Sequence, residues 1–132
     1  IMENIRKKYI CKKQIKKGIS GTKDLLLNFK TGSSIALMID QRVSQGIRSN
    51  LFNKGALTTT IPAQFIKKYK TKIVPVYIER TKNFFFKIKF FEPVEFPNES
   101  SIEIITLKLN KILESMITKN PEQWIWTHNR WK

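Results

Sequence analysis

Hydrophobic residues fall into short segments whose spacing changes along the chain. In residues 4–17 a run of lysines without any acid is combined with apolar positions at four-residue spacing, which predicts a helix with one modest apolar stripe. Thr22 is placed to cap a second helix that runs to about Lys30, and Gly32 stands where a helix-ending glycine belongs. The first 30 residues are therefore expected to be mainly helical.

A continuous apolar segment follows at residues 34–39, between Gly32 and Asp40, and predicts a buried strand. Residues 40–57 are polar and dotted with glycine, so we expect a long loop, and long loops in compact domains often carry function. Three threonines at residues 58–60 and Pro62 open another predicted helix. Its inner face is expected to comprise Ile61, Phe65 and Tyr69.

Two later segments predict a pair of adjacent strands. Residues 72–78 form the first, and Pro75 within it lacks the N–H that a sheet ladder needs, so this position is expected at an edge or a bulge. In residues 84–91 apolar side chains alternate with Lys87 and Lys89, as in a half-exposed strand. Residues 79–83 would turn the chain back to complete a hairpin.

The last third of the chain carries marked helix-start signals. Ser100 and Glu103 have the spacing of a capping box, and a strong amphipathic helix is expected to follow, to about Thr118. Its apolar face comprises Ile102, Ile105, Leu109, Ile112 and Met116. The segment Asn120-Pro121-Glu122-Gln123 repeats the capping pattern and predicts a short terminal helix.

The predicted order is helix, helix, strand, helix, strand, strand, helix, helix. A strand–helix–strand unit with covering helices indicates an α/β layer with a partly parallel sheet. With 132 residues and 41% hydrophobic content, the chain has the size and composition of one domain with a core. It contains no apolar run of about 18 residues, so no membrane-spanning helix is expected.

The net charge of +15 implies an anionic partner, either nucleic acid, an anionic membrane surface or an acidic carrier protein. Composition alone does not choose between these three. The single cysteine, Cys11, allows no internal disulfide and fits a reducing compartment. The single histidine, His128, excludes any site that needs two.

Two segments carry a resemblance to a known family. The first is Leu37-Met38-Ile39-Asp40-Gln41, a predicted buried strand that delivers an acid and an amide into the long loop. The second is the terminal segment Pro121-Glu122-Gln123-Trp124-Ile125-Trp126-Thr127-His128-Asn129-Arg130-Trp131-Lys132. With the order of elements between them, they resemble the late acyltransferases of lipid A biosynthesis, the lauroyl and myristoyl transferase group, over essentially the whole chain.

The resemblance implies an O-acyltransferase of lipopolysaccharide biosynthesis, which moves a fatty acyl chain from acyl carrier protein to a hydroxyl of an anionic lipid A precursor. It also implies the α/β fold that resembles glycerol-phosphate acyltransferases, with a mixed sheet flanked by helices. The implied location is the cytoplasmic face of the bacterial inner membrane, with no cofactor, no metal and no nucleic acid. Catalysis in this family uses a histidine as general base, followed five residues later by an acid that orients it.

The catalytic pair is absent from these residues, because no acid follows His128 before the chain ends at Lys132. The chain opens with Ile1, and we expect residues 1–132 to be the C-terminal portion of a single acyltransferase domain, with the pair and a membrane-anchoring helix upstream. A degenerate paralogue is the alternative. The chain alone is expected to be inactive.

Five residues are candidates for holding the substrate. Asp40 would lie at the C-terminal end of a strand, where open α/β sheets bind ligands, although it could instead be a turn residue that caps the loop; Gln41 follows it. The resemblance implies that Arg6 binds substrate phosphate or the developing oxyanion, and Arg80 points to the same sheet edge as Asp40. A solvated basic side chain is the alternative for both. Arg130 would bind lipid phosphate or pair with a buried acid.

The terminal aromatic residues are expected to be structural. Trp124, Trp126 and Trp131 favour packing, although tryptophan also occurs at membrane interfaces, and His128 is expected to be a hydrogen-bonded structural histidine. Two other classes of function stay open: a small basic nucleic-acid-binding module and a peripheral membrane-binding protein without catalysis. The first lacks zinc-finger spacing, an aromatic-basic RNA-binding signature and a clear helix-turn-helix.

Overall fold

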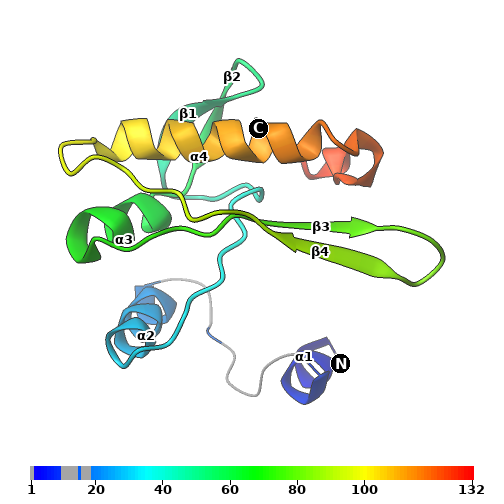
Figure 1. The fold of residues 1–132 in the computed structure, drawn as a ribbon, viewed down its shortest axis with the longest axis horizontal. Helices are drawn as coiled ribbons and strands as arrows, with labels where there is room; N and C mark the ends of the chain where they lie inside the picture. Colours follow the sequence, from blue (N-terminus) through cyan, green and yellow to red (C-terminus); the bar gives the residue numbers. More distant parts are fainter. Residues whose placement is uncertain (1, 10–14, 16–18) are drawn as a thin grey trace. The chain divides into compact units, whose positions relative to one another are not determined.

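The computed structural model describes residues 2–9, 15 and 19–132. The chain divides into two compact units, residues 1–37 and residues 38–132. Figure 1 shows the elements in chain order from blue to red. They are α1 (Met2–Tyr9), α2 (Ile19–Lys30), β1 (Ile47–Leu51), β2 (Lys54–Thr58), α3 (Ile61–Tyr69), β3 (Val76–Arg80), β4 (Phe86–Phe90), α4 (Ile102–Ile117) and two 3₁₀ turns, Pro121–Gln123 and Trp126–His128.

The helix that we expected over residues 4–17 is α1 as far as Tyr9. Residues 10–14 and 16–18 of that prediction lie outside the described part of the chain. Within α1, Lys7 Nζ and Glu3 Oε1 form an ion pair of 2.9 Å across one turn. Because both side chains are exposed, this pair adds little to stability.

The second helix begins earlier than predicted and ends as predicted. α2 begins at Ile19, so Thr22 lies in its first turn and is not its N-cap. Gly32 has φ +87°, and the N–H groups of Gly32 and Ser33 donate to the carbonyls of Phe29 and Asn28, each at 3.0 Å. A left-handed glycine closes the helix in this pattern without the steric cost of a Cβ.

The prediction of a buried strand at residues 34–39 is wrong. These residues have no ladder partner among the described residues, and an apolar segment becomes a strand only where a neighbouring strand supplies hydrogen bonds. Leu37 and Met38 are exposed, whereas Ile39 packs against the core of the second unit. The apolar pattern therefore identified one core residue and no sheet position.

A hairpin replaces most of the long loop that we expected at residues 40–57. β1 pairs antiparallel with β2, from Ile47↔Thr58 to Leu51↔Lys54. Phe52 and Asn53 form the turn, with φ of 51° and 58°, as a two-residue type I′ turn requires. The two turn positions contain no glycine, and phenylalanine rarely adopts a positive φ, so this turn was not predicted.

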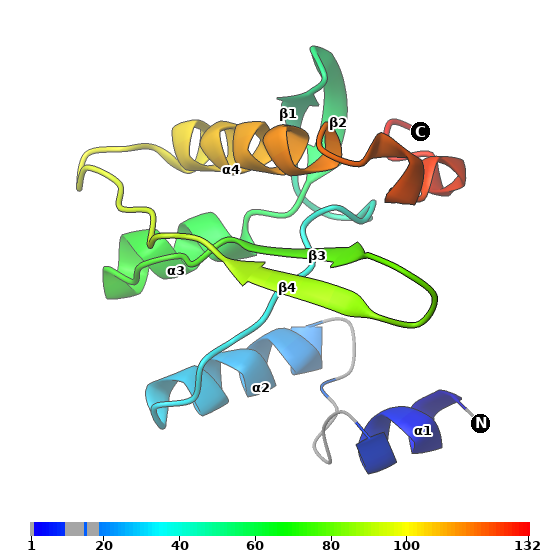
Figure 2. The ribbon, with the colours of Figure 1, turned by 45° about the vertical axis from the view of Figure 1, so that its right-hand side comes forward.

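The hydrophobic core of the second unit lies between α3 and α4. Ala63 and Ile66 of α3 pack against Ile105 and Leu109 of α4. α4 also contacts β1, and so it lies between α3 and the β1–β2 hairpin (Figures 1 and 2). The apolar face predicted for α4 is confirmed except at its end, where Ile117 is buried and Met116 is half-buried. Around this core pack Ile39, Ile73, Phe96, Ile102 and Ile112.

The buried face of α3 differs from the predicted one. Pro62, Ala63 and Ile66 are buried, whereas the residues expected there are only half-buried, namely Ile61, Phe65 and Tyr69. The distance between packed helices depends on the side chains at the contact, and the short side chain of Ala63 allows α4 to approach on this side. A periodicity analysis finds the helix but does not fix its rotation.

The N-cap of α4 is Ser101, whereas Ser100 was the cap that the sequence predicted. Ser101 Oγ accepts the N–H of Ile104 at 3.2 Å, while Ser100 is buried. The carboxylate of Glu103 accepts hydrogen bonds from its own backbone and from the side chain of Ser101, and these lower its pKa. An acid in the first turn also complements the helix dipole.

β3 and β4 form a second antiparallel hairpin, as predicted, from Val76↔Phe90 to Arg80↔Phe86. β3 begins later than the predicted 72–78 and extends into the predicted turn. Pro75 therefore lies just before the strand and not within it, and its carbonyl accepts the N–H of Phe91 at 3.0 Å. The partly parallel sheet that we expected does not form among the described residues, because α3 joins β2 to β3 without bringing them into one sheet. The observed fold is mixed α/β with two small antiparallel sheets.

Candidate functional site

The loop that carries Asp40 is joined to the end of the chain by one hydrogen bond. The backbone N–H of Arg42 donates to Nε2 of His128 at 3.0 Å. The imidazole of His128 thus serves as the acceptor for a backbone donor of the loop. The expectation of a hydrogen-bonded structural histidine is confirmed, and its partner lies in the loop of the first resemblance segment.

Arg130, two residues further on, is one of the most deeply buried side chains of the second unit. It is 1% exposed, with Nη1 donating to the Leu57 carbonyl and Nη2 donating to Thr58 Oγ1 at 2.9 Å. Burial lowers the pKa of the guanidinium, and the negative charge of Asp40 opposes that shift. Asp40 therefore acts on the buried cation through its charge.

Thr58 connects this arginine to α4. Its Oγ1 accepts from Arg130 and also from Asn110 Nδ2 at 3.3 Å, and the same Nδ2 donates to the Asn50 carbonyl at 3.1 Å. Asn110 is 0% exposed. Buried polar groups of this kind specify a single arrangement because each depends on its partners, so the network fixes the hairpin, α4 and the terminal segment against one another.

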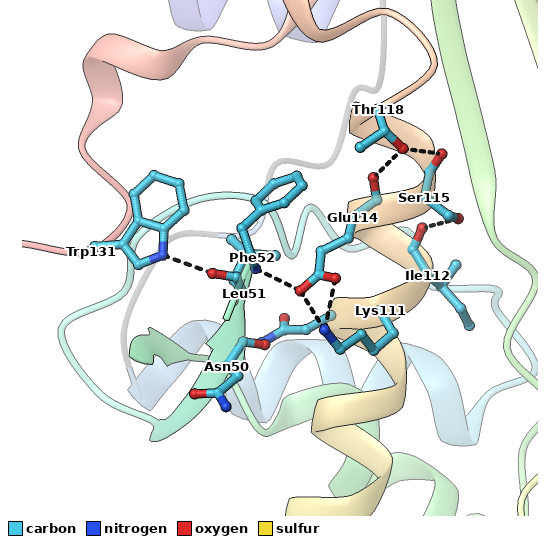
Figure 3. Close-up of polar contacts among 10 residues, drawn as sticks. Asn50, Leu51, Phe52, Lys111, Ile112, Glu114, Ser115, Thr118 and Trp131 are labelled. Atoms are coloured by element: carbon cyan, nitrogen blue, oxygen red, sulfur yellow. Dashed lines mark hydrogen bonds and ion pairs between the residues drawn. The ribbon is translucent and has the colours of Figure 1, made fainter. Parts of the chain in front are cut away.

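The turn of the β1–β2 hairpin is held by two further bonds, both drawn in Figure 3. Trp131 Nε1 donates to the Leu51 carbonyl at 3.0 Å, and the N–H of Phe52 donates to Glu114 Oε1 at 2.6 Å. Glu114 also forms an ion pair with Lys111 Nζ at 2.9 Å. A short bond to a carboxylate is a strong one, and it offsets the strain of a phenylalanine in the left-handed region.

An aromatic cluster covers the same turn. The ring of Phe52 lies 6.1 Å from Trp126 and 6.5 Å from both Trp124 and Trp131, measured between centroids. Trp124 and Trp126 meet edge to face at 4.6 Å, a geometry that aromatic pairs favour. The prediction that the three tryptophans pack is confirmed.

The loop that follows the first of the two segments thus contacts the second segment, and the comparison with known families gives this contact its context. A sequence model of the family described as bacterial lipid A biosynthesis acyltransferase matches residues 4–132. The chain belongs to that family. This match confirms the resemblance at the level of the family, whose role is acyl transfer in lipid A synthesis. No curated protein matches the chain significantly.

The candidate substrate residues of this lipid A acyltransferase chain occupy different environments. Asp40 is half-buried and acts electrostatically on Arg130. Gln41 is exposed, with Nε2 3.6 Å from Met38 Sδ. Arg6 is exposed on α1, in the first unit. Of the candidates, Asp40 and Arg130 are therefore linked electrostatically, and the substrate roles of all the candidates stay predictions.

Arg80 is exposed at the end of β3, with its guanidinium 5.3 Å from the centre of the Phe86 ring. Its backbone is held from both sides by Gln123, whose Oε1 accepts the Arg80 N–H at 2.8 Å and whose Nε2 donates to the Arg80 carbonyl at 3.0 Å.

The sequence predicted Asn120 as the cap of the terminal turn, but its side chain makes no capping hydrogen bond. Its Nδ2 donates to Tyr77 and Glu79, both at 2.8 Å.

Sequence reasoning missed Thr58, Asn110 and Glu114 in this family member. One signal was available: Thr106 and Asn110 are polar residues four apart, flanking the apolar stripe of α4, and both are buried. No comparable signal marked Glu114, because an acid near the end of an exposed helix face looks solvated. Its partner, the Phe52 N–H, exists only after the turn has formed.

Two general features complete the description. Within the part of the chain that the structure describes, no helix combines the length and apolar character needed to cross a bilayer. Among the same residues, no three His, Cys, Asp or Glu side chains gather as they would around a metal ion.

Proposed function

We propose that this chain is the part of a lauroyl- or myristoyl-type O-acyltransferase that holds the substrate. The acyl group would pass from acyl carrier protein to a hydroxyl of an anionic lipid A precursor. The observation that carries the proposal is the family match over residues 4–132. The hydrogen bond between the Asp40 loop and the terminal segment supports it, because it links the loop after the first resemblance segment to the second segment.

Asp40 is the residue through which we propose that this site acts on the acceptor. It is half-buried, and its charge acts on the buried guanidinium of Arg130. A carboxylate accepts hydrogen bonds from sugar hydroxyls. In an enzyme in which residues 1–132 follow the histidine-and-acid pair, Asp40→Ala should lower turnover markedly. Gln41→Ala, at the exposed neighbouring position, serves as the control, and wild-type kinetics in Asp40→Ala would remove the role.

Residues 1–132 by themselves would not transfer acyl groups. His128 Nε2 already accepts the Arg42 N–H, and residues 129–132 contain no acid that could orient the imidazole. General base catalysis on a hydroxyl needs a free, oriented base. Purified chain incubated with acyl carrier protein carrying a labelled lauroyl group and a lipid A precursor should give no acylated product, and measurable transfer would contradict this proposal.

A finer fold is part of the same proposal. We infer that, in the complete enzyme, the two hairpins belong to a layered mixed sheet of the glycerol-phosphate-acyltransferase type. The family match over residues 4–132 supports this. Amide exchange on the complete enzyme would test it, since ladder hydrogen bonds to further strands would slow exchange in the hairpins below the rates in residues 1–132.

The β3–β4 hairpin supports a location at the anionic face of the inner membrane. One face of the hairpin exposes only apolar side chains at its first two register pairs, Val76↔Phe90 and Ile78↔Ile88. At the tip, Phe84 is 94% exposed and Phe85 72%. The exposed charges of this hairpin are basic, namely Arg80, Lys82, Lys87 and Lys89. Apolar side chains flanked by lysines suit the interface of an anionic bilayer.

Sedimentation with vesicles tests the location. The double variant Phe84→Ser with Phe85→Ser should weaken binding to phosphatidylglycerol vesicles by about tenfold or more for each ring, since a buried phenylalanine contributes about 1.5–3 kcal/mol. Ile125→Ser, also at an exposed apolar position (70%), is the matched control. Equal losses in both variants, or tighter binding to DNA than to vesicles, would contradict the proposal.

A further inference from the structure

The loop at residues 40–46 is held at few points. Residues 34–45 take part in no other backbone hydrogen bond, among the described residues, than that from Arg42 to His128. A segment without a ladder or turn bond depends on side-chain contacts for its conformation. The position of Asp40 is therefore decided by what reaches this loop from elsewhere in the chain.

The far end of the loop is pinned at Gly46. A Cβ at this position would lie 2.1 Å from the Thr58 carbonyl oxygen, so the backbone passes too close to β2 for any side chain. Thr58 is the residue whose Oγ1 binds Arg130. The loop is thus fixed to β2 at one end and to His128 at the other.

We propose that His128 is a positioning residue for the reaction: its Nε2 holds the Arg42 N–H and thereby sets the orientation of Asp40, two residues earlier, toward the substrate. The inference rests on the proposed substrate role of Asp40. His128 acts with Arg130, which is anchored in β2 and supplies the positive charge that acts on Asp40. The terminal segment is then a clamp on the site, and it takes no part in proton transfer.

The side chain at position 128 must accept a hydrogen bond in this arrangement. Glutamine places Oε1 close to where the imidazole places Nε2 and can accept the same N–H. Alanine leaves the N–H without a partner and removes most of the side chain. The pair His128→Gln and His128→Ala therefore separates hydrogen-bond acceptance from simple occupancy. Thr127→Ala, at an exposed neighbouring position, is the matched control.

Amide exchange at Arg42 in the chain of residues 1–132 is the first measurement. A net hydrogen bond contributes about 0.5–1.5 kcal/mol, so the Arg42 amide should exchange about two- to tenfold faster in His128→Ala. The rates in His128→Gln and Thr127→Ala should match the wild type. Unchanged exchange in His128→Ala, or fast exchange in His128→Gln, would overturn the clamp.

Turnover in an enzyme that contains these residues after the histidine-and-acid pair is the second measurement. His128→Ala should lower kcat/KM, and His128→Gln should restore it, which a catalytic or titrating role would not allow. If the Arg42 amide exchanged faster in His128→Ala while turnover stayed unchanged, the hydrogen bond would exist but the orientation of Asp40 would not matter for the reaction. That result would overturn the positioning role together with the proposed role of Asp40. Loss of turnover without faster exchange would overturn the clamp itself.

Discussion

Arg130→Met tests whether the buried guanidinium stabilises the second unit. The variant keeps an unbranched side chain and removes two hydrogen bonds, to the Leu57 carbonyl and to Thr58 Oγ1. Bonds to a charged group stabilise by about 1.5–3 kcal/mol each, which sets an upper limit of roughly 3–6 kcal/mol. Two effects reduce this: the guanidinium no longer has to be desolvated, and Thr58 keeps its donor from Asn110.

Only the Leu57 carbonyl is then left without its side-chain donor, at a cost of about 1–3 kcal/mol, and this is the net destabilisation that we expect. Urea unfolding followed by tryptophan fluorescence measures it, because Trp131 lies next to Arg130 in the chain and binds the same hairpin. Arg48→Met on β1, where the arginine is exposed, should change the free energy of unfolding by less than about 0.5 kcal/mol. An Arg130→Met variant as stable as the wild type, or more stable, would refute the reasoning, since desolvation would then outweigh the bonds.

Three further outcomes concern the elements around the site. Gln123→Ala should raise amide exchange at Arg80 and leave α4 unchanged, because Gln123 holds the Arg80 backbone from both sides; equal exchange would show that the contact is dispensable. Ser101→Ala should lower the free energy of unfolding by about 1 kcal/mol through loss of the N-cap, and the helix content measured by circular dichroism should fall with it. Ser100→Ala should leave the helix content unchanged, because Ser100 does not cap α4; an equal loss of helix content in both variants would contradict the assignment of the cap. The pKa of Glu103 is lowered in the folded chain, so its contribution is present above the ordinary carboxyl pKa and is lost as pH falls through the lowered value; pH titration of stability in Glu103→Gln should lack that part of the acid loss.

The helices were largely predictable because their signals are local. The apolar stripe of α4 repeats at three- and four-residue spacing, and Ile105 and Leu109 are buried as that spacing requires. Gly32 closes α2 as expected, because a left-handed glycine needs only the preceding helical turn. The β3–β4 hairpin was also predicted, since alternation and a polar turn are neighbours in the sequence.

The errors lie where a segment depends on a distant partner. Residues 34–39 have the composition of a buried strand, yet a strand also needs a neighbouring ladder. The β1–β2 hairpin turns at Phe52, which is unfavourable alone and is stabilised by Glu114, 62 positions away. Ser101 rather than Ser100 caps α4, because the adjacent serine is buried by tertiary packing.

The sequence by itself determined the family, the helix periodicities and the two segments from which the site is built. Local spacing and residue type suffice for these, since they need no knowledge of what lies opposite. Only the tertiary structure decided that His128 accepts the Arg42 N–H and that the charge of Asp40 acts on Arg130, because the partners are 86 positions apart in the first case and similarly distant in the second. A buried cation is tolerated only when the fold supplies acceptors and a counter-charge together, and no pattern along the chain contains that information.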